Sequence, residues 1–195
     1  MEWVLAPIIG YLLGSVPVAA LVARREGVDL LRVGDGNPGA WNALEQLGWR
    51  RAWPAFIGDG AKGLLAGLAG LLLGDVYTAY AGVAGAMVGH CFPVFNRFRG
   101  GKAVMTFGGG VFALSPLAAG LALAILGAIA TLRSPKWGVR VGVFGFPLAQ
   151  LLFDPVERVM ATGALMTLIG LRYLAPGHRD SSAPATSATG AAPPA

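Results

Sequence analysis

Residues 33–42 form the first of two glycine-rich segments that could bind an anion, and they read Val-Gly-Asp-Gly-Asn-Pro-Gly-Ala-Trp-Asn. Glycines at this density allow positive φ angles, and successive backbone N–H groups in such a turn form a concavity that suits an anion. The flanking Arg50 and Arg51 favour a phosphate or carboxylate site and are expected to supply charge support, although the composition alone would suit an ordinary loop. The residues predicted to surround the anion are Gly34, Gly36, Asn37, Gly39 and Asn42.

Residues 89–102 form the second segment and combine a histidine, two arginines, three glycines and a lysine. An imidazole can act as a general base near neutral pH, so His90 is predicted to be a base or an orienting group. Glycines before a helix let backbone N–H groups approach an anion, so Gly100 and Gly101 are predicted to bind a phosphate. Lys102 would add a positive charge at the same place.

Asp59 and Lys62 lie three residues apart within an apolar stretch, so they share one face of a helix. Ionisable residues inside a membrane span are costly and mark functional sites. We predict that Lys62 contributes to phosphate binding and that Asp59 supports it. The structural alternatives are a plain buried ion pair for these two residues, and a core histidine for His90.

Other common chemistries have no matching motif in this sequence. The glycine and hydroxyl neighbours of a P-loop lysine are missing beside Lys62 and Lys102. No paired cysteines or His-Glu-x-x-His motif suggests zinc, so no metal is expected. A Gly-x-Ser-x-Gly motif, as in serine hydrolases, is also missing.

The composition indicates an integral membrane protein. Of 195 residues, 55% are hydrophobic and only 13% are charged, against about 25% in a typical soluble domain. This excludes a disordered chain, a coiled coil and most soluble enzyme folds. The single cysteine, Cys91, excludes an internal disulfide. The net charge of +5 is interpreted as membrane topology rather than as nucleic-acid binding.

The apolar stretches predict an all-α protein with seven transmembrane helices. A helix needs about 20 apolar residues to cross the bilayer, and Pro116 divides the longest stretch into a short helix and a longer one. The expected spans are residues 2–23, 52–73, 76–95, 103–114, 117–132, 138–153 and 156–174. Residues 1–175 would form the membrane domain, and residues 176–195, rich in Pro, Ala, Ser and Thr, a disordered tail.

The basic residues orient these spans. With the N-terminus outside, Arg158 is the one basic residue out of 15 that lies outside, and the C-terminus is cytoplasmic. A reading with six helices would place Arg133, Lys136 and Arg140 outside, against the positive-inside rule. We therefore expect seven spans, with the two glycine-rich segments at the cytoplasmic face.

With these motifs assembled, the chain resembles the bacterial acyl-phosphate:glycerol-3-phosphate acyltransferases, the PlsY family. Residues 14–17 (Gly-Ser-Val-Pro) are similar to its first-helix motif, and residues 33–42 to its first glycine-rich signature. Residues 59–63 (Asp-Gly-Ala-Lys-Gly) match its Asp-x-x-Lys-Gly motif. The string from Gly89 to Lys102 matches the next signature almost throughout and is the most specific of the four.

The resemblance implies a function and its participants. A fatty acyl group would pass from acyl phosphate to the sn-1 hydroxyl of glycerol 3-phosphate, giving lysophosphatidate and phosphate in phospholipid synthesis. It implies no cofactor, a bacterial inner membrane location and a cytoplasmic active site among membrane lipids. A monomer is expected, without nucleic acid. The predicted catalytic residues are His90, Lys102 and Asn37.

Departures from the family pattern keep other functions open. The family usually has Ser where Asp35 stands, Thr at Trp41 and Arg at Glu45, and its third signature is not evident near Lys136. Asp35 places a negative charge in the predicted phosphate loop, and Arg50 or Arg51 would have to compensate for Glu45. One alternative is a catalytically impaired or repurposed relative that binds lipid or regulates a partner. Another is a transporter of phosphorylated solutes, which would need a polar path that the one-sided charges do not provide.

Overall fold

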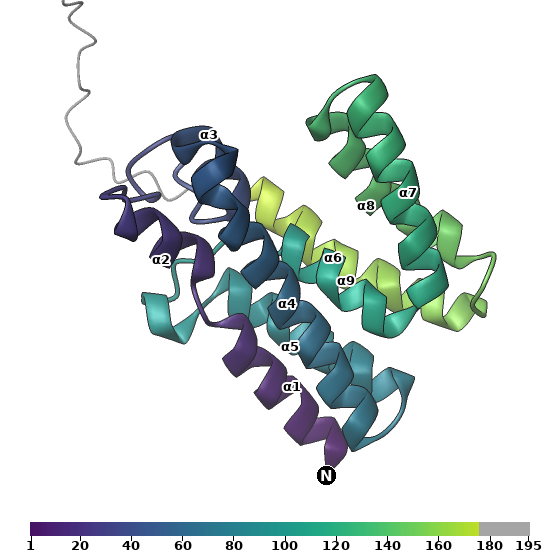
Figure 1. The fold of residues 1–195 in the computed structure, drawn as a ribbon. Coiled ribbons are helices and arrows are strands. Elements are labelled where there is room, and N and C mark those ends of the chain that lie inside the picture. The colour runs from purple at the N-terminus through teal and green to yellow at the C-terminus, as the bar shows by residue number, and fades with distance from the viewer. Residues whose placement is uncertain (176–195) are drawn as a thin grey trace, which may run out of the picture.

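The computed structural model describes residues 1–175, and in these residues all regular structure is helical (Figure 1). The predicted all-α class is therefore confirmed for the described part of the chain, whereas the predicted tail, 176–195, lies outside it. The helices are α1 (Glu2–Gly14), α2 (Val18–Arg25), α3 (Ala40–Leu47), α4 (Trp49–Leu73), α5 (Val76–Cys91), η1 (Val94–Asn96), α6 (Val104–Leu114), α7 (Pro116–Leu132), α8 (Pro135–Gln150) and α9 (Val156–Leu174).

Three stretches of helix in residues 1–175 are long and apolar enough to cross a membrane: Glu2–Arg25, Trp49–Leu73 and Val76–Asn96. Helices α6 and α7 are shorter but also apolar. The predicted break between them is confirmed, because α6 ends at Leu114 and α7 starts with Pro116. Proline suits the first turn of a helix, where its missing N–H would have no partner.

The first apolar stretch is interrupted, although the sequence predicts one continuous helix over residues 2–23. Helix α1 ends at Gly14 and α2 starts at Val18, with Pro17 between them. Proline has no N–H to continue the helical ladder, so carbonyl groups before it need other partners. The Val16 carbonyl oxygen accepts hydrogen bonds from the Val18 N–H at 3.0 Å and from the side chain of Lys62 at 3.1 Å, and these bonds compensate for the break.

Helix α3 was not predicted, because eight residues carry too little periodicity to distinguish a short helix from a loop. It starts inside the first glycine-rich segment, and Gly48 ends it with a φ of +73°. Helix α8 also starts earlier than the predicted residue 138. Ser134 accepts a hydrogen bond from the Trp137 N–H at 3.4 Å, and Pro135 occupies the first turn.

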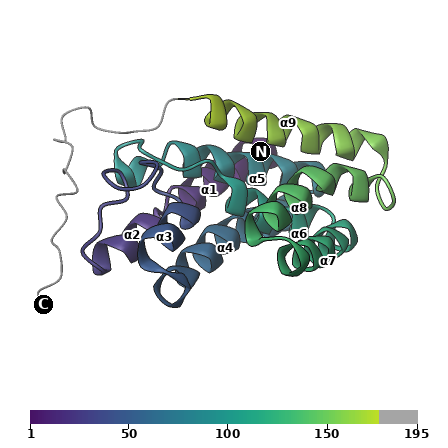
Figure 2. The ribbon, with the colours of Figure 1, turned by 90° about the horizontal axis from the view of Figure 1, so that it is seen from above.

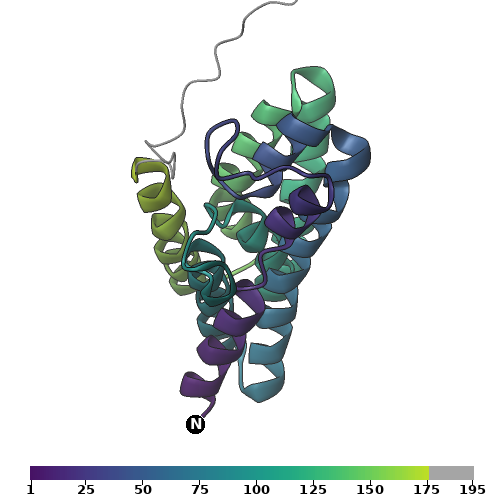
Figure 3. The ribbon, with the colours of Figure 1, turned by 90° about the vertical axis from the view of Figure 1, so that its left-hand side faces the viewer.

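The helices form a bundle with one hairpin at its side. Helices α1, α4 and α5 pack on one another, α6 packs on α4, and α7 pairs with α8 (Figure 1). Helix α9 runs along one side of the bundle, against α5 and α8 (Figure 2). The N-terminus lies at the end of the bundle opposite α3, as Figure 3 shows. We call the end that carries α3 the α3 end.

Glycines let the helix backbones approach closely, as is typical of membrane helix interfaces. A Cβ on Gly63 would lie 1.8 Å from the Thr106 carbonyl oxygen, and one on Gly109 would lie 1.8 Å from that of Gly60. Helices α4 and α6 therefore meet backbone to backbone. A larger hydrophobic core beside this contact includes Val83, Met87, Phe107, Phe146 and Ile169.

We predict that Gly109→Ala lowers the free energy of unfolding by about 1–3 kcal/mol, because the added methyl group forces α4 and α6 apart. Gly108→Ala is the matched control, since a Cβ there meets nothing within 4 Å. Thermal unfolding in detergent micelles should show a lower melting temperature for the first variant alone. Equal melting temperatures for the two variants would contradict the close contact.

Candidate functional site

A cavity of about 270 Å³ lies at the α3 end, between the two glycine-rich segments. Its walls come from the first segment and α3, from α4, α5 and α6, and from α8 and α9. The lining residues are Asp35, Asn37, Gly39, Ala40, Trp41, Phe56, Asp59, His90, Lys102, Ala103, Val104, Met105, Lys136, Val139, Arg140 and Tyr173. The structure therefore brings five of the sequence-predicted residues together: Asn37, Gly39, Asp59, His90 and Lys102.

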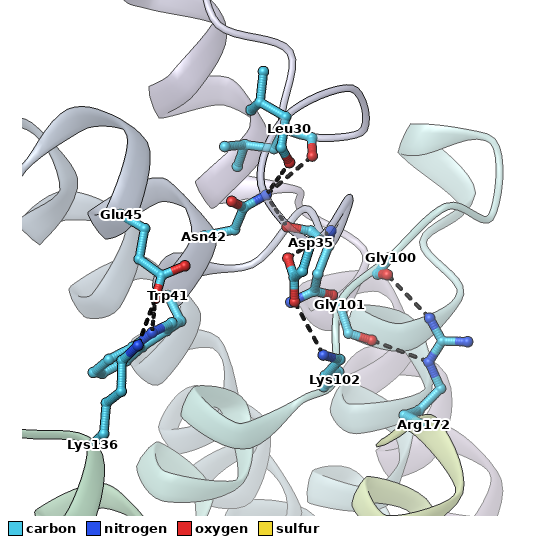
Figure 4. A network of polar contacts seen from close by, with 12 residues as sticks. Leu30, Asp35, Trp41, Asn42, Glu45, Gly100, Gly101, Lys102, Lys136 and Arg172 are labelled. Carbon is cyan, nitrogen blue, oxygen red and sulfur yellow. Dashed lines mark hydrogen bonds and ion pairs between the residues drawn. The ribbon is translucent and has the colours of Figure 1, made fainter. Parts of the chain in front are cut away.

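Asn42 organises the first glycine-rich segment from behind the cavity wall. Its buried amide nitrogen lies 3.0–3.1 Å from the carbonyl oxygens of Leu30, Val33 and Asn37 and shares its two hydrogens among them (Figure 4). Gly34 and Gly36 supply the positive φ angles, +61° and +69°, that the winding of the chain requires. Asn42 and these glycines thus shape the loop, while Asn37 and Gly39 face the cavity.

Arg172 of α9 clamps the second glycine-rich segment. Its Nη2 donates to the Gly100 carbonyl oxygen at 3.1 Å and its Nε to that of Gly101 at 3.2 Å (Figure 4). The Gly101 N–H donates to the His90 carbonyl oxygen at 3.1 Å, so this amide already has a partner inside the protein. A Cβ on Gly101 would lie 2.3 Å from Nε2 of His90. Because the two glycines have no side chain, the loop can pack directly against His90.

Lys102 and the start of α6 supply the positive side of the cavity. Ala103 takes a left-handed conformation with a φ of +58°, which turns the chain so that α6 starts at Val104. The first N–H groups of a helix have no partner within it and favour negative charge. Lys102 Nζ lies 3.2 Å from Oδ2 of Asp35 and 4.7 Å from the ring centre of Tyr173. This corner of the cavity suits an anion.

Asp59, Lys62 and His90 form a buried cluster beside the cavity. Lys62 Nζ lies 2.9 Å from Oδ1 of Asp59, and His90 Nδ1 lies 3.7 Å from the same oxygen. Asp59 and His90 line the cavity. Lys62 is not among the lining residues in the described part of the chain. Lys62 instead binds the Val16 carbonyl oxygen, so its observed contacts secure the α1–α2 break.

Helices α3 and α8 are joined beside the cavity by contacts among three side chains. Lys136 Nζ lies 3.0 Å from Oε1 of Glu45, and the Trp41 indole N–H donates to the same oxygen at 2.9 Å (Figure 4). The hydrogen bond from Lys136, with that from Trp41, holds the pKa of Glu45 below its usual value. Glu45 therefore stays ionised and fixes Lys136 at the cavity.

Among the polar side chains that line the cavity, Lys136, Arg140 and Tyr173 are not assigned to the site by the sequence. The spacing of Lys136 and Arg140, four residues on one helical face, was the signal that could have found them. Of the two predicted supporting arginines, Arg51 pairs with Glu26 at 3.1 Å. Neither Arg50 nor Arg51 is part of the cavity lining that residues 1–175 provide.

A second cavity, of about 410 Å³, opens between α4, α6, α7 and α8. Its lining is almost entirely apolar and includes Leu64, Phe112, Leu123 and Phe146. The two cavities share four lining residues, namely Phe56, Val104, Met105 and Val139. A polar, cation-lined compartment therefore adjoins an apolar one, which suits an anionic molecule with a hydrocarbon chain.

Crystal structures of PlsY, described as an integral membrane glycerol 3-phosphate acyltransferase, have a similar fold. The glycerol 3-phosphate form has a TM-score of 0.80 and 29% identity, with 89% of each chain covered. The lysophosphatidic acid form has a TM-score of 0.76 and 28% identity, with 89% of this chain and 88% of that chain covered.

Curated sequences agree with the structural likeness. A glycerol-3-phosphate acyltransferase of Roseobacter denitrificans is 42% identical over 164 residues, which is 82% of each chain. One of Thermus thermophilus is 39% identical over 169 residues, covering 83% of this chain and 82% of the relative. The profile of the family described as glycerol-3-phosphate acyltransferase matches residues 4–180. The chain thus belongs to the glycerol-3-phosphate acyltransferase family.

Proposed function

We propose that this protein transfers a fatty acyl group from acyl phosphate to the sn-1 hydroxyl of glycerol 3-phosphate. The observation that carries the proposal is the cation-lined cavity, which gathers Asn37, His90 and Lys102 beside an apolar compartment. The names of the relatives and the ligand-bound PlsY forms support glycerol 3-phosphate as acceptor and lysophosphatidate as product. The donor, acyl phosphate, comes from the family resemblance.

The reaction needs positioning and charge stabilisation more than a covalent nucleophile. The hydroxyl oxygen of glycerol 3-phosphate attacks the acyl carbonyl carbon, the carbon–oxygen bond to phosphate breaks, and phosphate leaves with the electron pair. Lys102 and the N–H groups at the start of α6 stabilise one phosphate. Asn37 and Gly39 of the first segment face the other.

His90 is the proposed acceptor or guide of the hydroxyl proton. An oxygen of Asp59 lies 3.7 Å from Nδ1 of the ring, and Gly101 packs against Nε2. The proton then passes either to His90 or to a phosphate oxygen of the substrate, and both routes balance the reaction. Arg172 acts through the glycine loop and is a positioning residue.

The apolar cavity is the proposed binding place for the acyl chain. It lies between α4, α6 and the α7–α8 hairpin and adjoins the polar cavity through Phe56, Val104, Met105 and Val139. An acyl phosphate bound across both compartments would place its carbonyl carbon near their junction. The chain would then remain among helices rather than in water, which avoids the cost of exposing apolar surface.

The membrane arrangement completes the proposal. Counting α1 and α2 as one span gives seven, with α4 to α9 as the others. The N-terminus lies outside and the α3 end at the cytoplasmic face of a bacterial inner membrane, because basic residues are retained on that side. The cavity at this end is lined by Lys102, Lys136 and Arg140, and these positive charges support an active site at the cytoplasmic face. The protein is proposed to act there as a monomer.

We predict that Lys102→Ala lowers kcat/KM for phosphate release from acyl phosphate and glycerol 3-phosphate by about 10²–10³-fold, as loss of a charge-stabilising donor does. Arg133→Ala, which removes an exposed charge outside the cavity lining, is the control and should retain activity. The assay measures released phosphate from purified protein. Absence of acceptor-dependent release by the unmodified protein would reject the acyltransferase and favour the repurposed relative.

We also predict that Gly108→Phe lowers the activity on long-chain relative to short-chain acyl phosphates by about tenfold or more. Gly108 lines the apolar cavity and has open space around its Cβ position, so the ring fills the proposed acyl site without displacing α4. Gly120→Phe, at an equally open position of α7 outside the described lining, is the control. An unchanged chain-length profile would place the acyl chain elsewhere.

A further inference from the structure

Asp35 places a negative charge at the part of the cavity where an anion is expected to bind. Among residues 1–175, two carboxylates line the cavity, Asp35 and Asp59. Asp59 is 1% exposed and lies 2.9 Å from the buried Lys62. Asp35 is instead about half exposed, and its Oδ2 lies 3.2 Å from Nζ of Lys102. Figure 4 shows the two side chains pointing toward each other from separate loops.

We propose that Asp35 is an internal counter-ion of Lys102, which a phosphate group must displace to bind. This inference rests on the proposed function, since it assigns the displaced position to the phosphate of a substrate or product. Asp35 therefore competes with every anion that enters the site. It weakens the binding of glycerol 3-phosphate or acyl phosphate, and by the same factor it favours departure of the released phosphate.

The charges around Lys102 explain why an exchange is needed. Lysine has three donor hydrogens and could contact two anions, but a phosphate beside Lys102 would also lie close to the Asp35 carboxylate. Like charges a few ångströms apart repel, so binding is easier once Asp35 turns away. The other cavity lysine, Lys136, also has a carboxylate partner, because its Nζ lies 3.0 Å from Oε1 of Glu45.

The pair is weak enough to be exchanged. The side chains of Lys102 and Asp35 are 27% and 52% exposed, and ion pairs in contact with solvent are worth about 0–1 kcal/mol. Asp35 also has an anchor that does not depend on its charge. Its Oδ1 accepts a hydrogen bond from the Asn37 N–H at 3.0 Å. The carboxylate can thus leave Lys102 while the loop keeps its shape.

Asp35→Asn removes the negative charge but keeps the shape of the loop, because the amide oxygen of asparagine can still accept the hydrogen bond from the Asn37 N–H. A matched control is present in the same region of the chain. Asp29 accepts a hydrogen bond from the Leu31 N–H at 3.1 Å and lies 3.4 Å from Arg32, so it has the same kind of turn and ion pair. It is not part of the described cavity lining, so Asp29→Asn removes an equivalent charge away from the site.

The experiment measures the Kd of inorganic phosphate and the KM for glycerol 3-phosphate with the full chain in detergent. We predict that Asp35→Asn lowers the phosphate Kd by about fivefold, the factor that corresponds to about 1 kcal/mol, and lowers the KM in parallel. Asp29→Asn should leave both unchanged. In a Lys102→Ala background the effect of Asp35→Asn should disappear, because the competition acts through Lys102.

Three other outcomes would overturn the inference, and each has a different meaning for the site. Equal phosphate affinity in the unmodified protein and Asp35→Asn, with acyltransferase activity present, rejects the counter-ion and leaves the proposed function standing. Weaker binding in Asp35→Asn would show that Asp35 contributes to the site rather than competing for it. Phosphate binding to neither protein, together with no acyltransferase activity, rejects both proposals.

Discussion

The ion pair between Asp59 and Lys62 is the contact on which the site depends most. Both side chains are at least 95% buried in an apolar bundle, where an unpaired charge would be very costly. The pair, on α4, contacts two other parts of the fold: Lys62 binds the Val16 carbonyl oxygen at the α1–α2 break, and Asp59 faces His90 of α5. The same pair therefore links the break in the first span to the side chain of the proposed base.

The break itself has a consequence for the cavity. Because α1 ends at Gly14 and α2 restarts at Val18, the chain changes course before it enters the first glycine-rich segment. That segment then folds around Asn42 and presents Asn37 to the cavity. On the opposite wall Arg172 holds the second segment against His90. Both walls are thus fixed by side chains that lie behind them.

The sequence predicted local features well and long-range ones poorly. Pro116 was enough to place the division between α6 and α7, because proline acts on its own turn. The sequence instead predicts one span across Pro17, since Lys62, which binds the Val16 carbonyl oxygen at the break, lies 46 residues further along the chain. Arg172 and Tyr173 reach the site from α9, about 70 residues from the loop that they contact, and no spacing rule connects them.

The ion pairs at the site differ in how easily they separate, because some are buried and others are exposed to water. The Asp59–Lys62 pair has little access to water, so separating it would strand two charges in a medium that solvates them poorly. The Asp35–Lys102 and Glu45–Lys136 pairs are partly exposed, and water replaces either partner at small cost. A site that takes up and releases anionic molecules needs both kinds of contact. In the proposed site, the buried pair maintains the geometry, and the exposed pairs hold the cavity lysines until an anion replaces the carboxylate.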